Sequence, residues 1–401
     1  MKTPSLLAVL GLLAASHVAA YEITGITASQ DHNLIREEYM VQVGPNPIDR
    51  FKMTRVVKAV PPARLRGSIL FLFPLGTTFS FYEQRDPNGA FGTSIAEFFA
   101  LRNYDVYGYS PRFEGIPAGA CESGLFDCSI MKTWDLASMV EDIAFVRSQI
   151  EAFHHDTKIV VGGASLGGIL AVAVADDAPD DYDGFLLWEG MLNTPDPAVR
   201  ALNQGYCETL QAQLAAGASF DSSIGLFREI ARQAEINPSG LAAIPLFPPS
   251  LTNHQVMVLS LSTPTPGPIS MPVPGYVQMN GSLAKDRLFF ASEPRLFENV
   301  VHRFNNYTPH VTTRDISCSL AGVETKYVDN LGAVHGSVLA IGGGRGFGPY
   351  LDDQLAQFTG TTDKTLLLRE GFGHIDHFMT AKHRDYVERP IYEWLVRVFG
   401  E

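Results

Sequence analysis

The sequence predicts an α/β fold, and three observations indicate this class. Short apolar runs rich in β-branched residues alternate with segments whose apolar residues recur at helical spacing. One such run, residues 158–161, passes through a glycine-rich turn straight into a second apolar segment, residues 169–175. The alternation continues to about residue 190 and resumes after residue 320, so the chain is expected to hold one core with a long insertion.

The pattern of apolar residues predicts the position of each element. Residues 21–60 have the character of the strands that open a sheet. In the insertion, proline-rich residues 245–274 interrupt the predicted helices. Strands are expected at 38–43, 55–60, 68–73, 104–109, 158–161, 185–188, 338–341 and 365–368. Helices are expected at 95–101, 134–150, 169–175, 199–216, 222–235, 293–304 and 390–398.

The turn at residues 163–167 reads Gly-Ala-Ser-Leu-Gly and predicts a nucleophile. A strand that turns at once into a helix forces the middle residue into a strained conformation, and glycines are needed beside it because Cβ atoms would clash. The strain lifts the hydroxyl of Ser165 clear of the backbone. The N-terminus of the following helix then favours a developing oxyanion.

A second motif follows the last expected strand, where residues 369–377 read Arg-Glu-Gly-Phe-Gly-His-Ile-Asp-His. His374 comes directly after the glycines and is the expected general base for Ser165. His377 is the competing candidate, whereas Asp376 is expected to fix the loop. His154 and His155 are interpreted as surface residues at a helix end.

Together, the Gly-Ala-Ser-Leu-Gly turn and the Gly-Phe-Gly-His-Ile-Asp loop resemble those of the α/β-hydrolase family, over most of residues 65–401. The resemblance implies a mostly parallel eight-stranded sheet with helices on both faces and a Ser–acid–His triad. It also implies that the insertion after strand six is a cap. The expected division is a signal peptide at 1–20, a core at 21–190 and 321–401, and a cap or lid at 191–320.

The acid of the triad is the least regular part of this resemblance. Most α/β-hydrolases carry an aspartate after strand seven, but the glycine-rich residues 342–349 hold no carboxylate. Glu189 ends strand six, where some members of the family place the acid, and it is the preferred candidate. Asp352 or Asp353 is the first alternative. The remaining alternatives are Asp315 and Asp329.

The oxyanion hole also departs from the family pattern. The loop after strand three usually begins His-Gly, and here Pro74-Leu75 stands in that place. Gly76 is the preferred backbone N–H donor, with Leu75 and Thr77 as alternatives. The second donor expected from the resemblance is the N–H of Leu166, which follows the nucleophile.

The first twenty residues predict a secretory signal peptide. Lys2 supplies the charged end, residues 6–15 the apolar stretch, and residues 18–20 a small-residue cleavage site. A secreted chain with four cysteines is expected to form two disulfides. The short spacing favours Cys121–Cys128, which leaves Cys207–Cys318 to join the two ends of the insertion. Asn280 and Asn306 lie in glycosylation sequons.

The formal net charge of −13 argues against nucleic acid and anionic membranes as partners. No His-Glu-x-x-His or Cys-x-x-Cys spacing occurs, so neither a metal nor another cofactor is expected. The chain is expected to be a monomer without an integral membrane segment.

A serine nucleophile acts through an acyl-enzyme, so the sequence predicts a secreted serine hydrolase that cleaves carboxylic esters. The Leu, Phe, Met and Pro content of the insertion favours an apolar or lipid-like small-molecule substrate. A lactonase is the close variant, followed by an acyltransferase or a peptidase. A non-catalytic binding protein on the same fold is the alternative from a different class.

Overall fold

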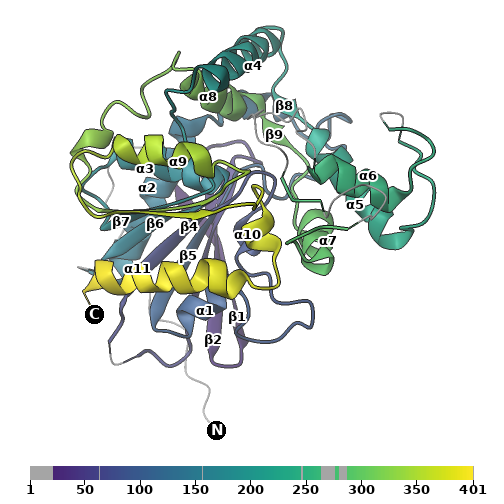
Figure 1. Ribbon diagram of the computed structural model, residues 1–401. Helices are drawn as coiled ribbons and strands as arrows, with labels where there is room; N and C mark the ends of the chain where they lie inside the picture. Colours follow the sequence, from purple (N-terminus) through teal and green to yellow (C-terminus); the bar gives the residue numbers. More distant parts are fainter. Residues whose placement is uncertain are drawn as a thin grey trace.

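The computed structural model describes residues 21–62, 64–155, 157–244, 247–262, 276–279 and 287–400. Its centre is a sheet of nine strands in the order β1-β2-β3-β5-β4-β6-β7-β10-β11 (Figure 1). The strands are β1 (Glu22–Asp31), β2 (Leu34–Gln42), β3 (Arg50–Lys58), β4 (Gly67–Leu72), β5 (Tyr104–Ser110), β6 (Ile159–Ala164), β7 (Gly184–Trp188), β10 (Ser337–Gly343) and β11 (Lys364–Arg369). The expected α/β class is therefore confirmed.

Strand direction divides the sheet into two parts. β1, β2, β3 and β5 pair antiparallel, whereas β5, β4, β6, β7, β10 and β11 pair parallel. The sheet has nine strands rather than the expected eight because the opening segment folds into three strands, with β1 added at the edge. The carboxyl ends of the parallel strands meet at one edge of the sheet, which is where such folds bind ligands.

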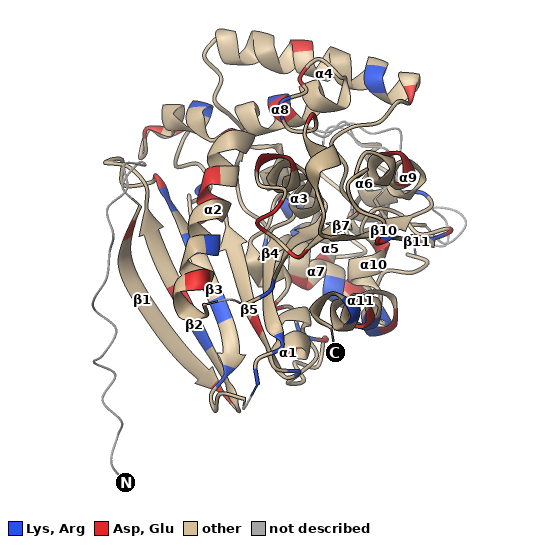
Figure 2. Cartoon of the chain, turned by 90° about the vertical axis from the view of Figure 1, so that its left-hand side faces the viewer, with Lys and Arg blue, Asp and Glu red and all other residues tan. Residues whose placement is uncertain are grey.

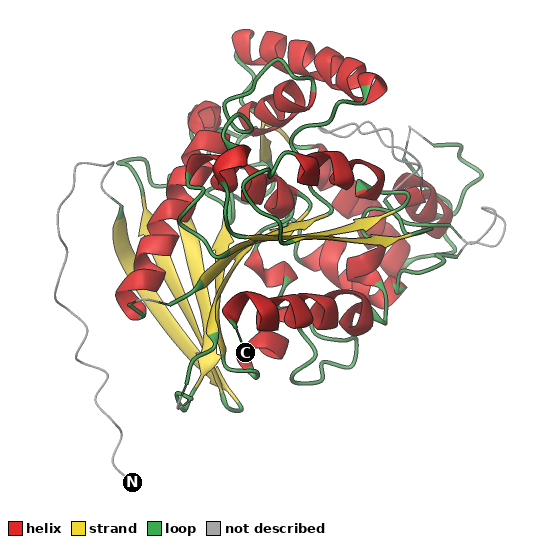
Figure 3. Ribbon diagram, turned by 60° about the vertical axis from the view of Figure 1, so that its left-hand side comes forward, coloured by secondary structure: helices red, strands yellow, loops and turns green. Residues whose placement is uncertain are grey.

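Helices cover both faces of the sheet, as Figures 1 and 3 show. The helices α2 (Leu136–Phe153), α3 (Leu166–Asp177) and α9 (Gly348–Ala356) bury one apolar cluster with the first face. The helices α1 (Ile95–Ala100) and α11 (Arg389–Phe399) bury a second cluster with the other face. Side chains of β4 alternate between the clusters, since Leu70 and Leu72 face the first and Ile69 and Phe71 the second. This arrangement fixes the strand ends from both sides.

The insertion after β7 is mainly helical. Its elements are α4 (Pro197–Ala215), β8 (Phe220–Asp221), α5 (Ser223–Ile236), α6 (Asn253–Ser262), α7 (Glu293–His302), β9 (Thr308–Pro309) and α8 (His310–Leu320). Helices α4 and α8 lie together at the top of Figure 1, and α5, α6 and α7 form a second group at its right. The helix α6 was not expected, because it lies inside proline-rich residues 245–274. The densest part of that stretch, 264–274, lies outside the described residues.

Two disulfides join parts of this framework, and both predicted pairings are confirmed. Cys121 pairs with Cys128 in the loop after β5. Cys207 of α4 pairs with Cys318 of α8, so the first and last helices of the insertion are joined. Helix α8 also contacts the core, because the hydroxyl of Thr312 donates to the carbonyl of Trp134 at 2.6 Å.

Acidic and basic side chains are interspersed on α2 and on the antiparallel strands (Figure 2). None of the helices in the described ranges is long and apolar enough to cross a membrane. The expected signal peptide, residues 1–20, and the sequon at Asn280 lie outside those ranges. In the second sequon the Asn306 side-chain amide donates to the carbonyl of Ile116 at 2.8 Å.

Candidate active site

Ser165 lies at the sharp turn between β6 and α3. Its backbone has φ 56° and ψ −116°, a combination that non-glycine residues rarely adopt. The sheet holds this conformation in place, because the Ser165 N–H donates to the carbonyl of Trp188 at the end of β7, at 2.7 Å. The glycines on either side are needed for close approach, since a Cβ on Gly163 or Gly167 would lie 2.2 Å from the Leu72 carbonyl oxygen.

Glu189 follows directly after Trp188 and has a similarly strained backbone, with φ 53°. Its N–H donates to the carbonyl of Ile341 in β10 at 2.8 Å, and its side chain is fully buried. A buried carboxylate needs hydrogen-bond donors. The N–H of Phe347 donates to Oε2 at 2.9 Å, and the N–H of Gly343 donates to Oε1.

The glycine-rich residues 342–348 therefore wrap around the carboxylate of a neighbouring strand. A Cβ on Gly346 would lie 2.2 Å from Oε2 of Glu189, so a side chain there would displace the carboxylate. The segment was expected to form the loop after the seventh strand; Gly342 and Gly343 instead end β10, the loop is residues 344–347, and Gly348 begins α9. The segment thus needs a glycine at 346 to accommodate the acid from the end of β7, whereas Gly343 and Gly348 are crowded by backbone atoms of the neighbouring segments.

His374 joins the two strained residues in one hydrogen-bonded chain. Its Nδ1 lies 2.8 Å from Oε2 of Glu189, and its Nε2 lies 3.0 Å from Oγ of Ser165. An ionised carboxylate accepts hydrogen bonds but cannot donate them. The imidazole proton therefore lies on Nδ1, and Nε2 is left to accept from the serine hydroxyl. The imidazole ring also packs edge-on against the rings of Phe347 and Tyr276, with centroids 4.7 Å and 5.7 Å away.

His377, the competing histidine, occupies a different environment. Its ring is fully buried and packs against Phe372, with centroids 5.0 Å apart. Burial, together with the positive charges of Arg369 and His374, lowers the pKa of His377 to about 3. The ring is therefore neutral at physiological pH, and it contributes to the packing of the histidine loop.

Asp376 fixes this loop through backbone contacts. Its Oδ2 accepts from the N–H of Gly373 at 2.7 Å and from the N–H of Gln278 at 3.1 Å. Burial raises the pKa of Asp376 to about 7 despite these two bonds, and the charge of Glu189 contributes in the same direction.

The alternative acids lie elsewhere. Asp352 is exposed on α9 and Asp353 half-buried beside it, while Asp329 is exposed in a loop. Asp315 is buried on α8, where it accepts from the N–H of Leu136. In the part of the chain that the structure describes, Glu189 is the carboxylate that contacts Nδ1 of His374.

The predicted oxyanion donors come from two segments, since Leu166 directly follows Ser165 and Gly76 lies in the loop after β4. Leu166 begins α3, and its N–H belongs to the first turn, where helix N–H groups have no intrahelical acceptor. Gly76 is buried with φ 84°, and its carbonyl accepts from the N–H of Asn305 at 2.5 Å. The N–H of Thr77 already donates to the carbonyl of Pro74 at 3.1 Å, which removes this alternative.

His154 is more than a surface residue, which corrects one expectation. It ends α2, and its Nε2 lies 2.6 Å from a carboxylate oxygen of the fully buried Asp105. Arg55 donates to the same carboxylate at 2.8 Å. The sequence could not reveal this partner, because Asp105 lies on a strand that is distant along the chain. His155 is exposed, as expected.

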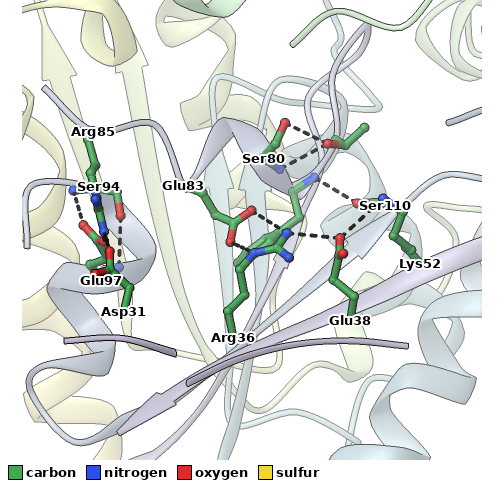
Figure 4. Close-up of polar contacts among 12 residues, drawn as sticks. Asp31, Arg36, Glu38, Lys52, Ser80, Glu83, Arg85, Ser94, Glu97 and Ser110 are labelled. Atoms are coloured by element: carbon green, nitrogen blue, oxygen red, sulfur yellow. Dashed lines mark hydrogen bonds and ion pairs between the residues drawn. The ribbon is translucent and has the colours of Figure 1, made fainter. Parts of the chain in front are cut away.

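A charged cavity of about 670 Å³ is a second candidate site. It lies between β2, the loop after η1 (Phe79–Phe81) and α7, and none of Ser165, Glu189 and His374 lines it. Figure 4 shows that two of its arginines, Arg36 and Arg85, are paired with neighbouring carboxylates. The pairs are Arg36 with Glu38 and Glu83, and Arg85 with Asp31 and Glu97. Because these ion pairs already neutralise the charged side chains, the cavity is a weaker candidate for a catalytic site than the surroundings of Ser165.

Within the described ranges, no group of three or more His, Cys, Asp or Glu side chains could hold a metal ion. The donor set at Ser165 is a hydroxyl, an imidazole and one carboxylate, which together suit proton transfer and nucleophilic attack.

Solved structures with known folds resemble this chain along most of its length. A lipase candidate from Sulfolobus solfataricus matches with a TM-score of 0.61 and 16% identity, over 93% of this chain and 99% of that one. A carboxyl esterase from Bacillus coagulans, solved with glycerol, matches with a TM-score of 0.55 and 14% identity, over 95% and 100%. The sequence matches no family model and no curated protein. The structural likeness establishes an α/β-hydrolase fold, as the two motifs predicted.

Proposed function

We propose that this protein is a secreted serine hydrolase that cleaves carboxylic esters through an acyl-enzyme. The observation that carries the proposal is the hydrogen-bonded chain from Ser165 through His374 to Glu189. Its strained backbone at both ends supports a catalytic role, because such strain is concentrated at functional sites. The lipase and esterase among the structural neighbours are consistent with this reaction class.

In the proposed mechanism, Oγ of Ser165 attacks the ester carbonyl carbon while Nε2 of His374 takes the hydroxyl proton. Glu189 holds the Nδ1–H and stabilises the imidazolium that forms. The tetrahedral oxyanion accepts hydrogen bonds from the N–H groups of Leu166 and Gly76. His374 then gives its proton to the leaving alkoxide, and the C–O bond breaks to leave the acyl-enzyme. A water molecule, deprotonated by His374, then attacks the acyl carbon. The bond from the acyl carbon to Oγ breaks, His374 returns the proton to Oγ, and the acid and free Ser165 are released.

We further propose that residues 191–320 act as the cap and favour an apolar, lipid-like ester. Apolar side chains of α5, α6 and α7 support this, since they extend the core cluster beyond the sheet. Secretion is proposed from the signal-like residues 1–20, and the two disulfides are consistent with an oxidising compartment.

Hydrolysis of a graded series of p-nitrophenyl esters, compared with lactones, tests the proposal. Turnover of the esters is expected, with a preference for medium or long acyl chains, and Ser165→Ala should be inactive on all of them. Absence of ester and lactone turnover in the correctly folded wild-type protein would refute the proposed activity. Preference for lactones would keep Ser165 as the nucleophile and change the substrate.

A further inference from the structure

A short segment of the insertion, residues 276–279, lies directly on the histidine loop; it is called the clasp below. The carbonyl of Tyr276 accepts from the N–H of Ile375 at 2.8 Å, one residue after His374. Two residues further along the clasp, the N–H of Gln278 donates to Oδ2 of Asp376. The clasp therefore holds the residues that immediately follow His374.

Gln278 also contacts the loop that surrounds the carboxylate of Glu189. Its side-chain oxygen accepts from Nη1 of Arg345, and Arg345 lies between the two residues, Gly343 and Phe347, that donate to Glu189. The N–H of Arg345 donates in turn to the carbonyl of Phe372, at 2.9 Å, at the start of the histidine loop. One residue of the insertion thus bridges the loop that surrounds the acid and the loop that carries the base.

The clasp has further support from within the insertion. The carbonyl of Gln278 accepts from the N–H of Phe289 at 2.7 Å, and Met279 pairs with Leu288 as an antiparallel bridge. Gln278 is 9% exposed and Arg345 is exposed, so the contact between their side chains is only partly buried. Hydrogen bonds to charged groups are stronger than neutral ones, particularly when they are buried.

We propose that Gln278 is a positioning residue, which couples the insertion to the catalytic centre by holding His374 and Glu189 in register through Asp376 and Arg345. The inference rests on the proposed function, since it assigns a role toward the proposed triad. The hydrogen bonds of the triad span two loops and one turn, so a small displacement of either loop would lengthen them. Misplacement of catalytic groups by about 1 Å is enough to cost about a hundredfold in rate.

Two substitutions at the same position test this role. Gln278→Met keeps the size of the side chain and removes the acceptor, whereas Gln278→Glu keeps an acceptor for Arg345. For Gln278→Met we expect about a tenfold lower kcat with little change in KM, since the bridge acts on His374 rather than on substrate. Gln278→Glu should restore most of the rate. Gln233→Ala is the matched control, because this glutamine of α5 bonds to Glu229 of the same helix.

The coupling can be measured independently of turnover. Hydrogen exchange at the Ile375 amide should be faster in Gln278→Met than in wild type, and unchanged in Gln233→Ala. The effects of Gln278→Met and Arg345→Ala on kcat should be less than additive, because both remove the same bridge. Unchanged exchange together with additive rate effects would overturn the inference.

Failure of the proposed function gives a different pattern. In that case the wild-type protein has no ester turnover and does not react with a fluorophosphonate, yet Ile375 exchange still reports on the clasp. If wild type reacts and Gln278→Met reacts at the same rate with unchanged exchange, only the inference about Gln278 fails.

Discussion

Ser165 and His374 are held in place by different parts of the molecule. The backbone of Ser165 is bonded to Trp188, and the glycines beside it pack on Leu72, so its surroundings are central strands of the sheet. The loop of His374 is bonded to the clasp of the insertion and, through the N–H of Arg345, to the glycine-rich loop that surrounds Glu189. The nucleophile therefore depends on the core alone, whereas the base depends on contacts between the core and the insertion.

This difference has a consequence for the chemistry. The turn at Ser165 should survive changes to the insertion, because its strain is balanced by sheet hydrogen bonds and close packing. The hydrogen bond from Ser165 to His374 should not, since the histidine loop has no strand on its far side among the described residues. Substitutions at the turn of Ser165 and in the loop of His374 therefore test the two regions separately.

Removal of the nucleophile should have the largest effect. Ser165→Ala is expected to lower kcat by about a thousandfold or more, with little change in melting temperature, because the substitution removes a single hydroxyl group from a half-buried side chain. His374→Ala should give a similar loss, since the two residues act as a unit. Steady-state kinetics on a p-nitrophenyl ester measures both. Half of the wild-type activity in Ser165→Ala would show that the turn is not a nucleophile site.

Charge removal at the acid comes next. Glu189→Gln keeps the shape of the side chain and should lower kcat by about a hundredfold to a thousandfold, because the imidazolium loses its partner. The matched controls are Asp352→Asn and Asp353→Asn on α9, which should stay active. Normal turnover in Glu189→Gln with collapse in either control would return the acid to the loop after β10.

His377→Ala should have a much smaller effect on catalysis than His374→Ala. Its ring is buried, neutral and packed on Phe372, so its removal leaves a cavity rather than a missing base. We expect less than a tenfold loss in kcat and a lower melting temperature. Equal loss of kcat in both variants would leave the base unassigned.

Asp376→Asn tests the electrostatics of the histidine loop through stability. The pKa of Asp376 is raised from 3.8 to about 7 in the folded state, so folding favours the protonated form. The group therefore stabilises the fold fully below pH 3.8, and this contribution is lost as the pH rises through 7. Asparagine keeps an acceptor oxygen without the charge. Its melting temperature relative to wild type should rise by roughly 2–5 °C between pH 5 and pH 8.

The pH dependence of this difference is the decisive feature. Asp353→Asn, on the half-buried face of α9, should show no such trend and serves as the control. A difference that stays constant from pH 5 to pH 8 would contradict the raised pKa and leave Asp376 with a purely steric role.

Local signals in the sequence were sufficient for the core of the fold. The apolar run before Ser165 and the glycines around it predicted a strand, a turn and a helix because all three depend on neighbouring residues. Glu189 could be proposed from its place at the end of a strand. The meaning of the glycine-rich loop around it could not, because Gly346 is small to accommodate a carboxylate 157 positions away in the chain.

The contacts of the insertion could not be predicted from the sequence for the same reason. Gln278 follows the proline-rich residues 245–274 and lies in no helix or strand pattern, and its partners Arg345 and Asp376 are distant in the chain. The helix α6 was hidden by the same composition. Pairings that depend on three-dimensional proximity leave no local pattern. The distant contacts that could be predicted were those of the cysteines, which have few possible partners, and those of the triad, which followed from the resemblance to the α/β-hydrolase family.

The most direct test of the catalytic assignment is covalent labelling of the intact protein with a fluorophosphonate, followed by peptide mapping. The account predicts a single adduct on Ser165, formed at least about a hundredfold more slowly in Glu189→Gln because His374 is then a poorer base. An adduct on another residue would contradict the assignment, as would the absence of reaction in folded wild-type protein.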